Sequence, residues 1–142
     1  MKTVLILFII SFSSLFQNNT SLEKCYGFEE FKFGSSKQLY KNLTLELEEG
    51  NSQLYTVNSN NTKLSGVQLD YFRVTFIKNK LTDISVSTKN TTGAVLFKFL
   101  KDNYGSPKKL KNRFEWIGKN VHIVFELYNN NKDAYVDFYS SK

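Results

Sequence analysis

Apolar and polar residues alternate through much of the chain, which is the period of a β-strand with one buried face. The clearest run is 67–77, where Phe72, Val74 and Phe76 occupy alternate positions. A polar turn at 78–80 follows, and alternation then resumes through residue 86. Two alternating runs joined by a short polar turn predict a β-hairpin.

The last third of the chain repeats this pattern. Strands are predicted near 110–117, 121–128 and 133–140, and short polar turns join them into an antiparallel meander. The segment 91–104 differs, because its apolar residues recur at helical spacing. Those residues are Leu96, Phe97, Leu100 and Tyr104. Gly105 and Pro107 then provide a stop signal, so 91–104 is predicted as a helix.

The first part of the domain is predicted to mirror the second. Ser35 or Ser36 can cap a helix over 35–43, and a strand follows at 43–47. Further strands are predicted near 53–58, 67–77 and 81–88. We therefore expect an α+β fold in which an antiparallel sheet of about six strands carries two helices packed on one face, with a possible α-β-β-β tandem repeat.

The N-terminus has the layout of a secretory signal peptide. Lys2 precedes seven consecutive apolar residues at 4–10, and small and polar residues follow. That run is shorter than the roughly 20 residues needed to span a bilayer. We predict a signal peptide at 1–17, cut between 13 and 21, an N-terminal segment at 18–30, and a single α+β domain at 31–142. The protein is then secreted or periplasmic.

Composition narrows the function further. The formal net charge of +6 favours solubility, and together with export it argues against nucleic acid as the partner. Cys25 is the single cysteine, so an internal disulfide is excluded, while a dimer through Cys25 stays open. No CxxC motif, Cys/His cluster or EF-hand spacing occurs, and no catalytic motif is found. We expect a non-enzymatic protein without cofactor or metal.

The candidate functional surface is the polar face of the predicted sheet. Its candidate contact residues are Tyr71, Arg73, Arg113, His122, Glu126, Tyr128, Tyr135, Asp137 and Tyr139, and Glu115 is predicted on the same face. Protein interfaces favour Tyr and Arg, so this face is predicted to bind a protein or a cell-envelope component. Open antiparallel faces are commonly polar in any case, and a plain solvated face is the alternative interpretation.

His122 carries a second hypothesis. It is the only histidine, and Glu126 lies on the same strand face about 13 Å away by the usual rise, too far for direct contact. A small hydrolase using His122 with a carboxylate from a neighbouring strand is therefore an alternative function. A structural or assembly factor of the envelope is another.

Three sequence segments show a family resemblance. They are FKFGSSKQ at 31–38, VTFIKNKLTDISV at 74–86, and NYGSP at 103–107, which is followed by the strand that contains Trp116. Together they resemble small signal-peptide-bearing proteins of unknown function of the Bacteroidota type. The predicted order of elements is also similar to the tandem architecture of β-lactamase inhibitor proteins. The first resemblance implies export, and the second implies a protein-binding role.

Overall fold

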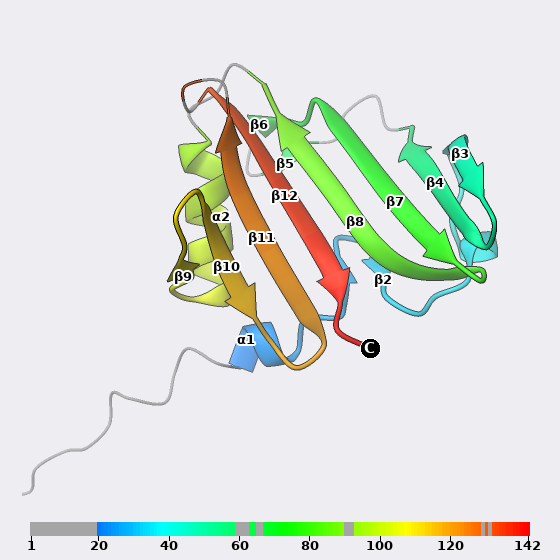
Figure 1. Cartoon of the computed structure of the whole chain (residues 1–142), viewed down its shortest axis with the longest axis horizontal. Helices are drawn as coiled ribbons and strands as arrows, with labels where there is room; N and C mark the ends of the chain where they lie inside the picture. Colours follow the sequence, from blue (N-terminus) through cyan, green and yellow to red (C-terminus); the bar gives the residue numbers. More distant parts are fainter. Residues whose placement is uncertain (1–19, 59–62, 65–66, 90–92, 129, 131) are drawn as a thin grey trace, which may run out of the picture.

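The main sheet of this computed structural model contains eight antiparallel strands, and the model describes residues 20–58, 63–64, 67–89, 93–128, 130 and 132–142 (Figure 1). The eight strands are β3 (Leu43–Glu49), β4 (Ser52–Val57), β7 (Tyr71–Ile77), β8 (Lys80–Thr88), β9 (Lys108–Lys109), β10 (Arg113–Ile117), β11 (Val121–Tyr128) and β12 (Asp133–Ser140). Their order across the sheet is β3-β4-β7-β8-β12-β11-β10-β9. The prediction of an antiparallel, sheet-rich α+β fold is confirmed.

The remaining elements are short apart from one helix. They are α1 (Thr20–Glu23), β1 (Gly27–Phe28), β2 (Phe31–Lys32), the 3₁₀ helix η1 (Lys37–Leu39), β5 (Lys63–Leu64), β6 (Val67–Gln68) and α2 (Ala94–Tyr104). β1 pairs with β2, and β5 pairs with β6, each as a separate two-stranded unit. Among the described helices, none combines the length and the apolar character that a membrane span requires.

The predicted number of about six strands is wrong. The strand predicted at 43–47 is observed as β3, and it lies at one edge because the chain turns tightly after Glu49 and pairs residues 43–49 with β4. β9 adds a strand at the other edge, where Lys108 and Lys109 fold back on β10. The central six strands have a symmetric order, β4-β7-β8 followed by β12-β11-β10. The two sets of three strands meet at β8 and β12, which pair with each other.

The predicted α-helix at 35–43 is also wrong, because this segment forms only the 3₁₀ turn η1. Tyr40 already has extended backbone angles, and Asn42 has a positive φ of 59° directly before β3. A segment this short has little intrinsic helical stability without an apolar stripe to bury. Leu39, which would belong to that stripe, is 72% exposed.

The helix α2 packs against one face of the sheet, at the end formed by β10, β11 and β12 (Figure 1). Leu96 and Leu100 are buried, and the Phe97 ring lies 4.7 Å from the Phe114 ring and 5.2 Å from the Phe125 ring, measured between centroids. This helix was predicted at 91–104, of which residues 91–92 lie outside the described part. The predicted stop is observed, since Gly105 has a φ of 83°.

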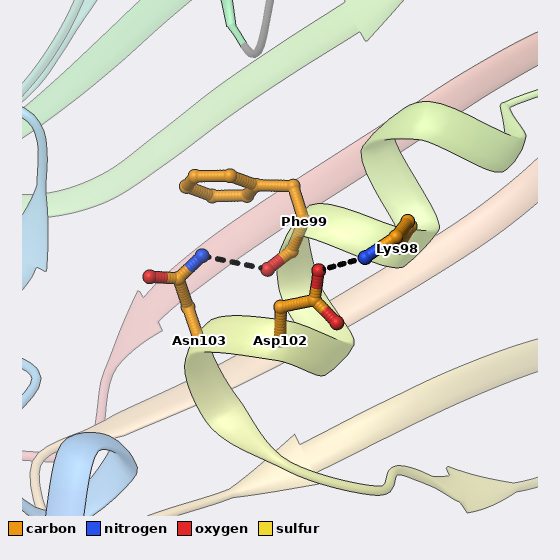
Figure 2. A network of polar contacts seen from close by, with 4 residues as sticks. All are labelled: Lys98, Phe99, Asp102 and Asn103. Carbon is orange, nitrogen blue, oxygen red and sulfur yellow. Dashed lines mark hydrogen bonds and ion pairs between the residues drawn. The ribbon is translucent and has the colours of Figure 1, made fainter.

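Figure 2 shows polar contacts on the outer side of α2, in the C-terminal half of the helix. Lys98 forms an ion pair with Asp102 one turn later, and Asn103 Nδ2 donates to the Phe99 carbonyl oxygen at 2.8 Å. Pairs at this spacing support a helix that has water on one side. The helix is therefore amphipathic, as the sequence predicted.

The β1–β2 hairpin covers the part of the inner face for which the sequence predicted a helix. The Phe28 ring lies 4.8 Å from Phe138 and 5.8 Å from Phe72, and the Phe31 ring lies 5.1 Å from Phe72. Phe28 and Phe31 are both buried in the core. Described residues of the predicted N-terminal segment 18–30 thus pack into the same core as the sheet, and no described helix or strand covers the other face of the sheet (Figure 1).

Candidate binding face

All nine residues predicted for the functional surface lie on strands, on the side facing away from the core. They come from β7 (Tyr71, Arg73), β10 (Arg113), β11 (His122, Glu126, Tyr128) and β12 (Tyr135, Asp137, Tyr139). The alternation of burial along the strands places them there, because their neighbours in β7 and β12 are buried at every second position. We call this side of the sheet the open face.

The strand register arranges the open face in three consecutive rows across the sheet. The first row is Tyr71, Ser87, Tyr135, Glu126 and Arg113. The second row is Arg73, Ser85, Asp137, Val124 and Glu115. The third row is Thr75, Asp83, Tyr139, His122 and Ile117. Tyr128, paired with Asp133, begins the next row. The predicted residues are therefore close neighbours.

Three tyrosines form a continuous aromatic path over the open face. The Tyr71 and Tyr135 ring centroids are 6.0 Å apart, and the Tyr128 and Tyr135 centroids are 4.9 Å apart with their planes at 85°. This edge-to-face geometry is one that aromatic rings favour. The guanidinium of Arg73 lies 4.5 Å from the Tyr71 ring centre. The path thus runs from β7 over β12 to β11.

Carboxylates lie beside these rings at the centre of the sheet. Asp137 accepts a hydrogen bond from Ser85 Oγ, and Asp83 accepts one from Thr82 Oγ1 at 2.5 Å. Burial raises the pKa of the Asp83 carboxyl and the nearby Asp137 charge adds to this, although the Thr82 hydrogen bond acts in the opposite direction. The centre of the open face therefore concentrates negative charge.

The environment also raises the pKa of the phenols. The hydrogen bond from Tyr128 to Glu126 is the main cause that raises the pKa of Tyr128 to about 12. Burial, followed by the charge of Asp137, raises the pKa of Tyr139 to about 12. Burial raises the pKa of Tyr71. The phenols are consequently neutral hydrogen-bond donors at physiological pH.

The two arginines of the predicted surface each pair with an acid of the same sheet. Arg73 Nε lies 2.9 Å from Glu46 Oε2, and Arg113 Nε lies 2.6 Å from Glu115 Oε1. Glu46 belongs to the edge strand β3, at a bulge between Leu45 and Leu47. These pairs neutralise the positive charges that flank the acidic centre.

Glu115 is the functional candidate that the site prediction missed. It is 6% exposed, and its Oε2 atom lies 3.5 Å from His122 Nε2. The two residues are diagonal neighbours, because Ile117 pairs with His122 while Glu115 pairs with Val124. Glu126 was considered as the acid on the same strand. Alternation also placed Glu115 on this face, but its contact with His122 depends on the register of the neighbouring strand.

Three hollows lined by described residues lie away from the centre of the open face. The first, of about 410 Å³, is lined by residues that include Cys25 and Tyr104. The other two, of about 450 Å³ and 340 Å³, lie beside β9 and β10. None of these three is lined by His122 or by any residue of β12.

Cys25, considered for a dimer, is buried in the core at 8% exposure, and its Sγ lies 3.2 Å from the Gly27 carbonyl oxygen. A disulfide between two copies would require this thiol to become accessible. Within the described residues, no group of three or more His, Cys, Asp or Glu side chains is arranged to hold a metal ion. The predicted signal peptide at 1–17 lies outside the described residues.

Comparison of the chain with protein-family models yields no match, and comparisons with curated proteins and with solved structures yield no significant one.

Proposed function

We propose that this chain is an exported binding domain that contacts a protein or a cell-envelope component through its open face. The observation that carries the proposal is the continuous path of Tyr71, Tyr135 and Tyr128 over three strands. Tyrosines provide a large contact area at low entropic cost, and their hydroxyls donate hydrogen bonds. Export is supported by the pattern of the first 21 residues and by the resemblance to small exported proteins.

Exposure supports the same face. Tyr128 is 50% exposed and Tyr139 is 39% exposed, and the apolar side chain of Ile117 beside His122 is 63% exposed. Large, partly apolar side chains that gather on one face favour association. The strands behind them are rigid elements with a packed inner face, which holds the surface in place before a partner arrives.

The test is the capture of a partner from an extract of the source cells, followed by mass spectrometry. The double variant Tyr128→Ala/Tyr135→Ala should lose the captured partner. The control variant Tyr26→Ala removes a tyrosine that is 54% exposed outside the main sheet, and it should capture as the wild type does. All three proteins should unfold at similar denaturant concentrations. Undiminished capture by the double variant contradicts the proposal.

The identity of the captured protein separates this function from an assembly role. A partner that is a secreted protein or a periplasmic enzyme fits a binding domain. Co-purification with outer-membrane proteins instead favours the alternative of a structural or assembly factor of the envelope.

A small hydrolase is the second candidate, and the contact between Glu115 and His122 is the observation that favours it. A carboxylate beside a histidine can orient the ring as a general base. The pair lies on the sheet face, and the His122 side chain is 36% exposed. Hydrolysis of a simple nitrophenyl ester that is lost in His122→Gln and in Glu115→Gln would establish this function, and equal rates in all three proteins would exclude it for that ester.

A further inference from the structure

The charge of the open face is opposite to that of the whole chain. The chain has a formal net charge of +6, yet β11 and β12 contain no Lys or Arg, and β8 contains only Lys80 at its start. The same three strands carry the acids Asp83, Glu126, Asp133 and Asp137. A basic protein thus has an acidic centre on its open face, and local charge of this kind selects partners.

The open face itself shows how it accommodates a cation. The Arg73 guanidinium lies 4.5 Å from the Tyr71 ring centre and also forms an ion pair with Glu46. One positive group therefore interacts with an aromatic ring and a carboxylate together. Both interactions favour a cation, the ring through its negative face and the acid through its charge.

The same combination of ring and carboxylate recurs at the centre of the sheet, on β8, β11 and β12. Asp137, Asp83 and Glu126 are the charges that act on Tyr139, and Glu126 also accepts a hydrogen bond from the hydroxyl of Tyr128. In the described part of the chain, the ion pairs of Lys and Arg with acids are Arg73–Glu46, Lys89–Asp70, Lys98–Asp102 and Arg113–Glu115. None of them involves Asp83, Glu126 or Asp137.

We infer that the centre of the open face binds Lys or Arg side chains presented by a basic surface of a partner protein. Each cation would contact a tyrosine ring and a carboxylate, as Arg73 does on the same face. A broad protein surface suits the site because its rings and carboxylates lie on three adjacent strands of one sheet face, β8, β12 and β11. This inference rests on the proposed function and specifies the chemistry of the partner.

The probe is a short oligolysine peptide, with an oligoglutamate peptide of equal length for comparison. Oligolysine should bind and shift the backbone amide NMR signals of β8, β11 and β12, whereas oligoglutamate should not shift them. The triple variant Asp83→Asn/Glu126→Gln/Asp137→Asn should bind oligolysine on the order of tenfold more weakly, because three charge pairs at the protein surface are lost. Higher salt should weaken binding by the wild type.

The matched control neutralises three exposed acids elsewhere, Glu30→Gln, Glu48→Gln and Asp102→Asn, and so gives the same net charge. It should retain the affinity of the wild type for oligolysine. Equal weakening in the two triple variants, or shifted signals outside the three strands only, overturns the inference. The single variant Glu126→Gln provides the same test, with a smaller loss, if the triple variant does not fold.

Capture of the natural partner from the cell extract distinguishes a failure of this inference from a failure of the proposed binding function. If capture depends on Tyr128 and Tyr135 but not on the three acids, the inference of a basic partner surface is wrong and the proposed binding function stands. Capture that does not depend on the tyrosines overturns the proposed function, whatever oligolysine does.

Discussion

Tyr128 donates its phenolic hydrogen to the carboxylate of Glu126, two residues earlier on the same strand and the same face. A charge-assisted hydrogen bond of this kind holds the phenol in its neutral form. It also orients the ring that meets Tyr135 edge to face. The most exposed tyrosine of the aromatic path is therefore positioned by an acid of the same face.

The variant Glu126→Gln should lower the pKa of Tyr128 from about 12 toward the ordinary value of 10.0, because an uncharged amide no longer opposes ionisation. In the wild type, the raised pKa contributes stability that is fully present below pH 10.0 and is lost as the pH rises toward about 12. NMR titration of the ring signals measures the shift. Tyr139 provides the comparison, since burial is the main cause of its raised pKa and the charge of Glu126 is only the smallest one, so the pKa of Tyr139 should fall much less than that of Tyr128.

Asp83→Asn should make the folded protein more stable at pH 7. Burial and the neighbouring Asp137 disfavour the ionised form of Asp83 in the folded state, so the folded pKa is above the usual 3.8. The stability of the wild type then falls as the pH rises from 3.8 through that raised pKa, and the variant avoids this loss.

Urea unfolding at pH 7 and at a pH well below 3.8 tests this, because the advantage of Asp83→Asn should vanish at the lower pH. The control Asp102→Asn removes the partner of Lys98 on α2 and should be slightly less stable than the wild type at pH 7. An Asp83→Asn protein that is less stable than the wild type at pH 7 would contradict the prediction.

Alternation alone was sufficient to predict the strands that carry the open face. In β7, Phe72, Val74 and Phe76 are buried at every second position, so the residues between them must face the other way. Because a shift of one residue would expose this whole apolar set, the face of each strand is strongly specified. The side of the sheet on which the candidate residues lie could therefore be predicted without a structure.

Contacts between segments distant in sequence could not be predicted in this way. Phe28 and Phe31 cover the inner face where a helix was expected, and nothing in the short segment 27–32 indicates that role. The diagonal contact of Glu115 with His122 depends on the register across the turn at 118–120, which is set when Gly118 N–H bonds to the Val121 carbonyl. Periodicity gives the face of a side chain but not its neighbour on the next strand.

Leu100→Ala should destabilise the fold by about 3 kcal/mol, because it removes a fully buried side chain and leaves a cavity. Leu100 is 0% exposed and lies on the inner side of α2. Val95→Ala on the same helix is the control, since Val95 is 47% exposed and its loss should change stability little. Guanidinium unfolding measures both, and similar losses in the two variants would show that α2 is not packed as described.

Gly93→Ala tests the junction between α2 and the sheet. Gly93 has a φ of 65°, and a Cβ atom there would lie 2.6 Å from Leu127 Cδ2 and 2.9 Å from Ala134 Cβ. The substitution therefore combines backbone strain with a steric clash against β11 and β12. Gly34→Ala separates the two effects, because Gly34 has a φ of 79° and no atom within 4 Å of the added methyl group.

Gly34→Ala should lower the free energy of unfolding by about 1 kcal/mol because of backbone strain. Gly93→Ala should lower it by about 1–3 kcal/mol more because of the clash. Chemical unfolding of the two variants gives the difference directly. The clash lies on the inner side of β11 and β12, directly behind the strands that carry Tyr128 and Tyr135, so Gly93→Ala should also shift the amide signals of these strands. Equal losses in the two variants would mean that α2 can move away from the sheet at no cost, and the open face would then lack a rigid support.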